Sequence, residues 1–287
     1  MLINLKNNAK SDCTIKFVDK ALTRISKHAD LDNPEEVKRF IANLQTSDNY
    51  KRNLCFAYKQ YCDYYKITWQ KPTYYQEPKT IRIPSTAHID MLIANSGKVM
   101  SVKLTLSKET GLRPVEVCNL KVKDIDLERK IVYPTTAKHG LARALKISNS
   151  LQEMLRIYID EHKLNLNDKL FKGDSENYGK HYRLHRNQLA EKLHKPELKS
   201  IRLYDFRHYF ATRLYAKTRD ILLVKQQMGH KKIETTLVYT QLLNQDNYDE
   251  WTCKATTDDN EATQLIEAGF EYVMTTPSGL MQFRKRK

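Results

Sequence analysis

Positions 204–210 carry the sequence Tyr-Asp-Phe-Arg-His-Tyr-Phe. This stretch predicts the start of a helix, with Asp205 as its N-cap residue. Phe206, Phe210 and Leu214 follow at helical spacing, which places them on one buried face. We therefore expect an amphipathic helix whose apolar stripe lies in a protein core.

Arg207 falls beside this apolar stripe, close to the expected helix start. Backbone N–H groups and the helix dipole favour an anion at such a position. The neighbouring His208 is more readily explained as a structural histidine than as a direct catalytic residue. Arg207 is therefore a candidate ligand for an anionic group.

A second arginine has a similar setting in Thr-Gly-Leu-Arg-Pro-Val-Glu at positions 110–116. Gly111 permits a tight turn, and Pro114 suits the first position of a helix. Arg113 would then lie at a helix N-terminus, where Glu116 could hold its guanidinium. Taken alone, the motif also fits a capped surface helix with an Arg/Glu pair.

A third segment surrounds Gly229 and His230. Gly229 is expected to end one helix in a left-handed cap and to leave His230 on the turn. Thr235 and Thr236 can cap the next helix, which carries Tyr239. In isolation this pattern also fits a helix-turn-helix that enters the major groove of DNA, or a tyrosine of the core.

Together, these residue types suit chemistry on a phosphodiester. Two guanidinium groups can bind the non-bridging oxygens of one phosphate and stabilise the charge that grows there. A phenol beside them would have a lowered pKa, because nearby cations favour its ionised form. Tyr239 is thus a candidate nucleophile that needs no metal.

The rest of the chain predicts a mainly α-helical protein with a small β-sheet or hairpin. Residues 1–78 are expected to form a helical domain, with helices over about 14–28, from Pro34 and from Asp48. Three prolines interrupt the pattern over residues 68–84, which we interpret as a linker.

Residues 79–250 are expected to form an α+β domain. Ser85 should cap a helix. A strand over 126–137 should enter a hairpin that turns at 138–140 and returns through 144–147. The segment 163–182 looks loop-rich and polar, and further helices are expected at the four ranges 151–159, 205–214, 220–228 and 235–243.

Residues 251–287 form a tail with a possible helix and a hairpin near the end. The last four residues, Arg-Lys-Arg-Lys, are interpreted as a frayed terminus that solvent surrounds.

The composition favours a polyanionic partner. The formal charge is +15, and residues 79–250 hold 31 basic against 20 acidic side chains. No segment resembles a transmembrane helix or a signal peptide, and five cysteines without a CxxC pair fit free thiols, so we expect a cytoplasmic protein without membrane contact. No dinucleotide, nucleotide-triphosphate, zinc or serine-hydrolase motif is complete, which predicts no metal and no cofactor.

Read together and in order, these segments resemble the tyrosine recombinase (phage integrase) family. The resemblance is strong over residues 85–243 and looser over 1–78, where the family has a helical core-binding domain. Tyr239 follows His230 by nine residues, as the family pattern requires. The resemblance implies an Xer-like enzyme, and residues 261–287 are similar to the tail of archaeal integrases.

The resemblance also implies a role for each matching residue. Arg113 and Arg207 would clamp the phosphate, His230 would donate a hydrogen bond to it, and Tyr239 would attack to give a 3′-phosphotyrosine. The hairpin lysine that protonates the leaving 5′-oxygen best matches Lys138, with Lys130 and Lys146 as less suitable candidates; Glu116 and His208 would support the site.

One position departs from the family pattern. Most members have His or Lys three residues before the second arginine, whereas this chain has Tyr204. A phenol can donate a hydrogen bond but is a poor base at neutral pH. The departure leaves open which group takes the proton of Tyr239.

The implied activity is site-specific recombination of double-stranded DNA without ATP or metal. The family works as a tetramer on two DNA sites, and the tail, with 262–268 as the candidate segment, would join neighbouring copies. Two alternatives remain at this stage, a catalytically idle DNA-binding regulator and a DNA topoisomerase of the related IB type.

Overall fold

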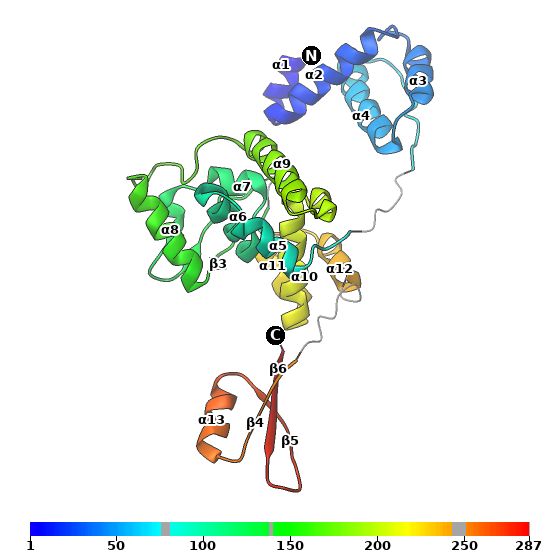
Figure 1. Ribbon diagram of the computed structural model, residues 1–287. Coiled ribbons are helices and arrows are strands. Elements are labelled where there is room, and N and C mark those ends of the chain that lie inside the picture. The colour runs from blue at the N-terminus through cyan, green and yellow to red at the C-terminus, as the bar shows by residue number, and fades with distance from the viewer. Residues whose placement is uncertain (76–80, 138–139, 243–250, 287) are drawn as a thin grey trace. The chain divides into compact units, whose positions relative to one another are not determined.

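A computed structural model describes residues 1–75, 81–137, 140–242 and 251–286. Contacts divide the chain into two compact units, Met1–Thr80 and Ile81–Lys287, close to the boundary expected after residue 78. The described chain is mainly helical with two small three-stranded antiparallel sheets (Figure 1), which confirms the predicted fold class. None of its helices in the described residues is long and apolar enough to cross a bilayer.

In the first unit, three of the four described helices begin at polar capping residues. Side-chain oxygens of Ser11, Asn33 and Ser47 accept hydrogen bonds from backbone N–H groups in the first turns of the second, third and fourth helices. The elements are α1 (Leu2–Asn7), α2 (Asp12–Ser26), α3 (Pro34–Asn43) and α4 (Asp48–Tyr65) (Figure 1). All but α1 were predicted from the sequence.

The core of this unit is apolar and aromatic. Leu54 and Tyr58 of α4 are fully buried, together with Val37 and Ile41 of α3. Tyr65, at the end of α4, is 52% exposed. Burial of these side chains removes apolar surface from water and holds the helices together.

The second unit is built around α10 (Leu203–Thr218), which packs against α6, α11 and α12. Phe206 is fully buried in its core. The other helices here are α5 (Thr86–Ala94), α6 (Lys98–Thr110), α7 (Pro114–Asn119), α8 (Asn149–Glu161), α9 (Ser175–Lys192), α11 (Ile221–Met228) and α12 (Glu234–Gln241), with 3-10 turns at Val122–Asp124 and Pro196–Ser200. The central helix thus joins segments that lie far apart in the sequence.

Helix α9 shows that the expectation of a polar loop over 163–182 was wrong from residue 175 onward. Few aliphatic residues mark this helix in the sequence, because aromatic residues and one arginine occupy its buried side. Tyr178, Tyr182 and Arg186 are at most 9% exposed. The Arg186 guanidinium donates a hydrogen bond to the Ile201 carbonyl at 2.7 Å, which makes burial of the charge possible.

The small sheet consists of three two-residue strands, β1 (Ile125–Asp126), β2 (Ile131–Val132) and β3 (Leu145–Lys146), in the order β1-β2-β3. The antiparallel return was predicted, but a continuous strand over 126–137 was not correct. Asp126 accepts a hydrogen bond from the Arg129 backbone, so the chain turns between β1 and β2. The β2–β3 connection has no helix or strand over its described residues, 133–137 and 140–144, and most of the predicted turn at 138–140 lies outside the described residues.

Two residues that were expected to cap helices have other positions in the structure. Asp205 is not the N-cap but the third residue of α10, where its carboxylate accepts from the Arg202 backbone N–H at 2.7 Å. Ile233 precedes α12, and Thr236 lies within that helix with its side chain fully buried. Asp205 therefore still caps the start of α10, but from the third helical position, whereas Thr236 contributes to the interior.

The tail, residues 251–286, has its own small core. Ala262 and Leu265 of helix α13 are buried with Phe283, and Figure 1 shows the helix beside its sheet. The elements are β4 (Trp251–Thr256), α13 (Asp259–Glu267), β5 (Glu271–Thr275) and β6 (Met281–Arg286), in the sheet order β4-β6-β5. The end of the chain forms the central strand, so the expectation of a frayed terminus was wrong as far as Arg286.

Candidate active site

Arg207 lies in the second turn of α10 and is fully buried. Its Nη1 donates to the Gly111 carbonyl at 2.6 Å, and its Nη2 donates to the Met228 carbonyl and approaches His230 Nε2 at 3.0 Å. Burial, followed by the charge of Arg113, lowers its pKa to about 10, so it remains a cation at neutral pH. Arg207 thus lies near the start of α10, as predicted, but its guanidinium is buried and held by the carbonyls of Gly111 and Met228.

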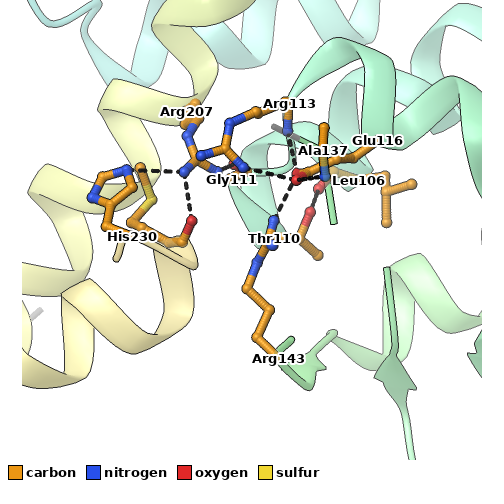
Figure 2. A network of polar contacts seen from close by, with 10 residues as sticks. Leu106, Thr110, Gly111, Arg113, Glu116, Ala137, Arg143, Arg207 and His230 are labelled. Carbon is orange, nitrogen blue, oxygen red and sulfur yellow. Dashed lines mark hydrogen bonds and ion pairs between the residues drawn. The ribbon is translucent and has the colours of Figure 1, made fainter. Parts of the chain in front are cut away.

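Arg113 is the N-cap residue of α7 and lies beside Arg207 (Figure 2). Its Nη1 donates to Glu116 Oε1 at 2.8 Å, and its backbone N–H donates to Oε2 at 2.9 Å. Glu116 is fully buried. The predicted Arg/Glu pair is thus present, but it lies in the interior and not on a surface helix.

A third arginine, Arg143, was missed in the sequence. Its side chain is fully buried, and its Nη2 donates to Glu116 Oε2 at 2.6 Å. Burial alone would raise the pKa of Glu116, but the hydrogen bond and charge of Arg143 lower it below its ordinary value. Arg143 directly precedes the predicted return strand, 144–147, and its position in the sequence carries no signal of burial.

Glu116 also positions the β2–β3 loop. Its Oε1 accepts from the Ala137 backbone N–H at 3.2 Å, and Leu141 N–H donates to the Gly229 carbonyl at 3.3 Å. The expected catalytic lysine, Lys138, lies outside the described residues. Of the described residues near it, Ala137 is held by Glu116 and Leu141 by Gly229, which directly precedes His230.

The other two candidate lysines lie elsewhere on the small sheet. Lys130 has a left-handed backbone in the β1–β2 turn, next to the end of β2 that is opposite the long loop. Lys146 is on β3, paired with Ile131. Neither belongs to the loop that Glu116 anchors.

His230 lies where α11 ends, directly after Gly229 with its left-handed backbone (φ +63°), as predicted. Its pKa is lowered to about 4 by burial and by nearby arginines, first among them Arg207. The ring is therefore neutral. Since Arg207 can only donate to Nε2, the proton belongs on Nδ1, which lies 2.9 Å from Thr236 Oγ1.

Tyr239 lies on α12 and is only 2% exposed. Burial raises its pKa above the ordinary value, although Arg207 and Arg113 act in the opposite direction. The expectation of a lowered pKa was therefore wrong for the protein without DNA. The charges act as predicted, but loss of water around the phenol outweighs them.

His208 and Tyr204 lie on the same side of α10, one turn apart. His208 Nδ1 is 3.1 Å from the Tyr239 hydroxyl, while the Tyr204 ring meets the His208 ring edge-on with centroids 5.0 Å apart. Tyr204 is 43% exposed. The structure thus brings His208, rather than the residue at the departing position, into contact with Tyr239.

The described residues contain no group of three or more His, Cys, Asp or Glu side chains that could hold a metal ion. Figure 2 shows the Arg113 guanidinium and the His230 imidazole beside Arg207, and the Tyr239 phenol lies next to His208, which follows Arg207 on α10. Such a set suits an anion that carries hydrogen-bond acceptors.

Comparisons with known proteins agree with the family resemblance of the sequence. The model of the phage integrase family matches residues 76–246. Tyrosine recombinase XerA of Pyrococcus horikoshii is 25% identical over 254 residues, which are 83% of this chain and 86% of that protein. XerA of Saccharolobus solfataricus is 32% identical over 148 residues, but the match spans only 47% of its length and 52% of this chain.

Solved structures agree in fold. The Tn1549 transposon integrase in complex with transposon right end DNA gives a TM-score of 0.61 at 15% identity, covering 82% of this chain and 91% of that chain. The XerH site-specific recombinase bound to difH substrate gives 0.54 at 21% identity, covering 76% of this chain and 70% of that chain. Because the family match covers more than half of the chain, this protein belongs to the phage integrase family of tyrosine recombinases.

Proposed function

We propose that this chain is a site-specific DNA recombinase that cleaves and rejoins double-stranded DNA through a covalent bond to Tyr239. The observation that carries the proposal is the environment of Arg207. None of the ion pairs formed within the described residues involves Arg207, although its side chain is fully buried. Its partners are two carbonyls and a neutral imidazole.

A buried cation without a carboxylate partner is costly, and Arg113 adds like-charge repulsion to that cost. Arg207 Nε also lacks a hydrogen-bond partner within the described chain. A phosphodiester between the two arginines would offset the repulsion and accept the remaining hydrogen bonds. The site is thus preorganised for a phosphate that carries a growing negative charge.

In the proposed reaction, Arg113 and Arg207 hold the scissile phosphate and His230 donates a hydrogen bond to it. The Tyr239 oxygen attacks phosphorus, the bond to the 5′-oxygen breaks, and Lys138 protonates that oxygen. For His230 to donate through Nε2, its ring proton must move from the position that the DNA-free structure favours. The phosphotyrosine conserves the bond energy, so neither ATP nor a metal is needed.

We also propose that four copies act on two DNA duplexes, joined through the tail. In the predicted segment 262–268, Ala262 and Leu265 are already buried within the tail, whereas Ile266 is 57% exposed. Contacts between copies would therefore use the outer side of α13. Mass photometry with and without duplex DNA would detect the tetramer.

The test of the proposed chemistry uses a pool of nicked duplexes with randomised sequence, so that the protein itself selects its target site. Covalent adducts are separated on a denaturing gel, their DNA is sequenced, and mass spectrometry identifies the modified residue. We expect a 3′-phosphotyrosine at Tyr239 and none in Tyr239→Phe, which should still bind DNA.

Other outcomes separate the alternatives. An adduct that persists in Tyr239→Phe would place the nucleophile elsewhere, with Tyr209 and Tyr248 as candidates. DNA binding without any adduct would support a regulator. Adducts at unrelated sequences, together with relaxation of supercoiled DNA without exchange, would support a topoisomerase.

A further inference from the structure

The proposed chemistry leaves the proton of Tyr239 without an acceptor. Attack by a phenol oxygen on phosphorus requires that this proton leave during bond formation. Tyr204 stands at the position where related enzymes carry His or Lys. A neutral phenol is a poor base, because its hydroxyl resembles the group that it would have to deprotonate.

His208 has the geometry that such an acceptor needs. Its Nδ1 lies 3.1 Å from the Tyr239 oxygen, although the two residues come from α10 and α12 and are 31 positions apart. Their ring centroids are 5.8 Å apart, with the rings inclined at 51°. This distance lies within the range at which a general base can take a proton directly.

From this contact we infer that His208 Nδ1 is the proton acceptor for Tyr239, in place of the His or Lys that the chain lacks at position 204. The inference rests on the proposed function. It assigns a catalytic role to a residue that the sequence favours as merely structural.

The protonation state of His208 agrees with this role. Burial lowers its pKa to about 4, so the ring is neutral at physiological pH and can offer a lone pair. The charged and titratable groups around it are Arg202, Tyr204, Asp205 and Arg207 on α10, His230 after α11 and Tyr239 on α12.

A bound phosphate would place a negative charge beside these groups. Its field would favour the protonated ring and so strengthen His208 as a base at the step that needs one. For this role, the neutral His208 ring carries its proton on Nε2, and the lone pair of Nδ1 is the acceptor.

The proposed step moves one proton to His208 and one to the leaving oxygen. The bond from the Tyr239 oxygen to phosphorus forms while its O–H proton moves to His208 Nδ1. The bond from phosphorus to the 5′-oxygen breaks, and that oxygen takes a proton from the general acid. In rejoining, the 5′-hydroxyl attacks phosphorus and returns its proton to the general acid. The bond between phosphorus and the tyrosine oxygen breaks, and the proton held by the imidazolium returns to that oxygen.

A competing explanation is that His208 only holds Tyr239 in its buried position. The two roles differ when the phenol is made more acidic. A strongly fluorinated tyrosine at position 239 has a more acidic phenol and therefore depends much less on a base, but it still needs correct placement.

The experiment measures single-turnover cleavage of a trapped duplex by the full chain. We expect His208→Asn to slow cleavage by roughly 10²–10⁴-fold. Fluorinated tyrosine at 239 should remove most of this defect. The double variant Tyr204→His/His208→Asn should also recover activity, because it restores a base at the family position.

Several results would overturn the inference. Cleavage by His208→Asn at the wild-type rate would show that the imidazole takes no proton. An equal defect with ordinary and fluorinated tyrosine would reduce His208 to a positioning residue. In both cases the wild-type chain still forms the adduct, whereas absence of any wild-type adduct would refute the proposed function itself.

Fluorinated tyrosine in the otherwise wild-type chain covers the case in which His208→Asn does not fold. Cleavage by the normal chain should fall in acid as His208 becomes protonated. The fall should disappear when residue 239 is ionised over the same pH range. Persistence of the same fall would contradict the role of His208.

Discussion

At the scale of single residues, Glu116 organises the site. Its two carboxylate oxygens accept hydrogen bonds from the side chains of Arg113 and Arg143 and from the backbone of Arg113 and Ala137. One buried anion thereby aligns Arg113, the first of the two arginines proposed to bind phosphate, and anchors the β2–β3 loop. Arg207, by contrast, has only neutral partners within the described chain, which leaves its charge for a ligand.

Arg143 should matter for stability far more than an exposed arginine. Arg143→Met leaves Glu116 buried with one cation fewer, so we expect a loss of about 3–5 kcal/mol in the free energy of unfolding. Chemical denaturation measures this loss. The matched control is Arg129→Met, because Arg129 is 77% exposed and lies 3.9 Å from Asp126; it should change stability by less than about 1 kcal/mol. Equal effects would contradict the assigned role of Arg143.

The two histidines of the site should make the DNA-free protein sensitive to acid. The pKa of both His208 and His230 is lowered to about 4, whereas an unfolded histidine titrates near about 6.5. Their contribution is complete above the unfolded value, and it is lost as the pH falls towards the folded value, because the unfolded chain binds more protons.

We therefore expect the midpoint temperature of thermal unfolding to fall as the pH is lowered from about 6.5 to about 4. The slope should be smaller in His230→Gln and His208→Asn. An unchanged slope in both variants would show that other groups cause the acid sensitivity.

At the scale of elements, the β2–β3 loop is attached to the site at two points. Ala137 hydrogen-bonds with Glu116, and Leu141 hydrogen-bonds with Gly229, which directly precedes His230. A side chain added at Gly140 would come within 3.0 Å of the Gly229 carbonyl, so the loop lies against that turn. These attachments support Lys138 as the general acid in preference to Lys130 or Lys146.

A substrate with sulfur in place of the 5′-bridging oxygen tests this role of Lys138. A thiolate leaves without protonation, whereas an alkoxide needs an acid. Lys138→Ala should therefore cleave normal DNA roughly 10²–10⁴-fold more slowly and cleave the sulfur-containing DNA nearly as fast as the wild type. Lys146→Ala serves as the comparison on the same sheet. Equal defects of Lys138→Ala on both substrates would make Lys138 a binding residue and leave Lys130 and Lys146 as candidates.

At the scale of the whole molecule, charge is unevenly distributed along the chain. Residues 79–250 hold 31 basic and 20 acidic side chains, whereas residues 251–287 hold five of each. In the tail, the acids lie mainly around α13, and four of the five basic residues are among the last four. The excess positive charge thus belongs to the segment that carries the candidate site.

DNA binding should accordingly weaken steeply with salt and persist without divalent metal. Each phosphate neutralised contributes about −0.9 to the slope of log affinity against log salt on a duplex. Fluorescence anisotropy at several potassium chloride concentrations, with and without EDTA, measures both effects. Salt-independent binding, or cleavage that EDTA abolishes, would contradict a metal-free phosphate clamp.

Local sequence determined much of this protein. Capping residues such as Ser47 and Ser85, helical spacing of apolar residues, and the left-handed glycines at 111 and 229 act over a few neighbouring positions, so their helices and turns were predictable. The order of Arg113, Arg207, His230 and Tyr239 identified the family for the same reason: each motif is a short local pattern.

Tertiary structure decided the features that depend on burial and on distant partners. Helix α9 shows no clear aliphatic pattern, because aromatic residues occupy much of its buried side. The last strand is ordered because it lies between β4 and β5. The contact of His208 with Tyr239 joins two helices, and the raised pKa of Tyr239 arises because loss of water outweighs the charges of two arginines. Desolvation and long-range hydrogen bonds depend on the packed core, and neither can be read from the spacing of residues along the chain.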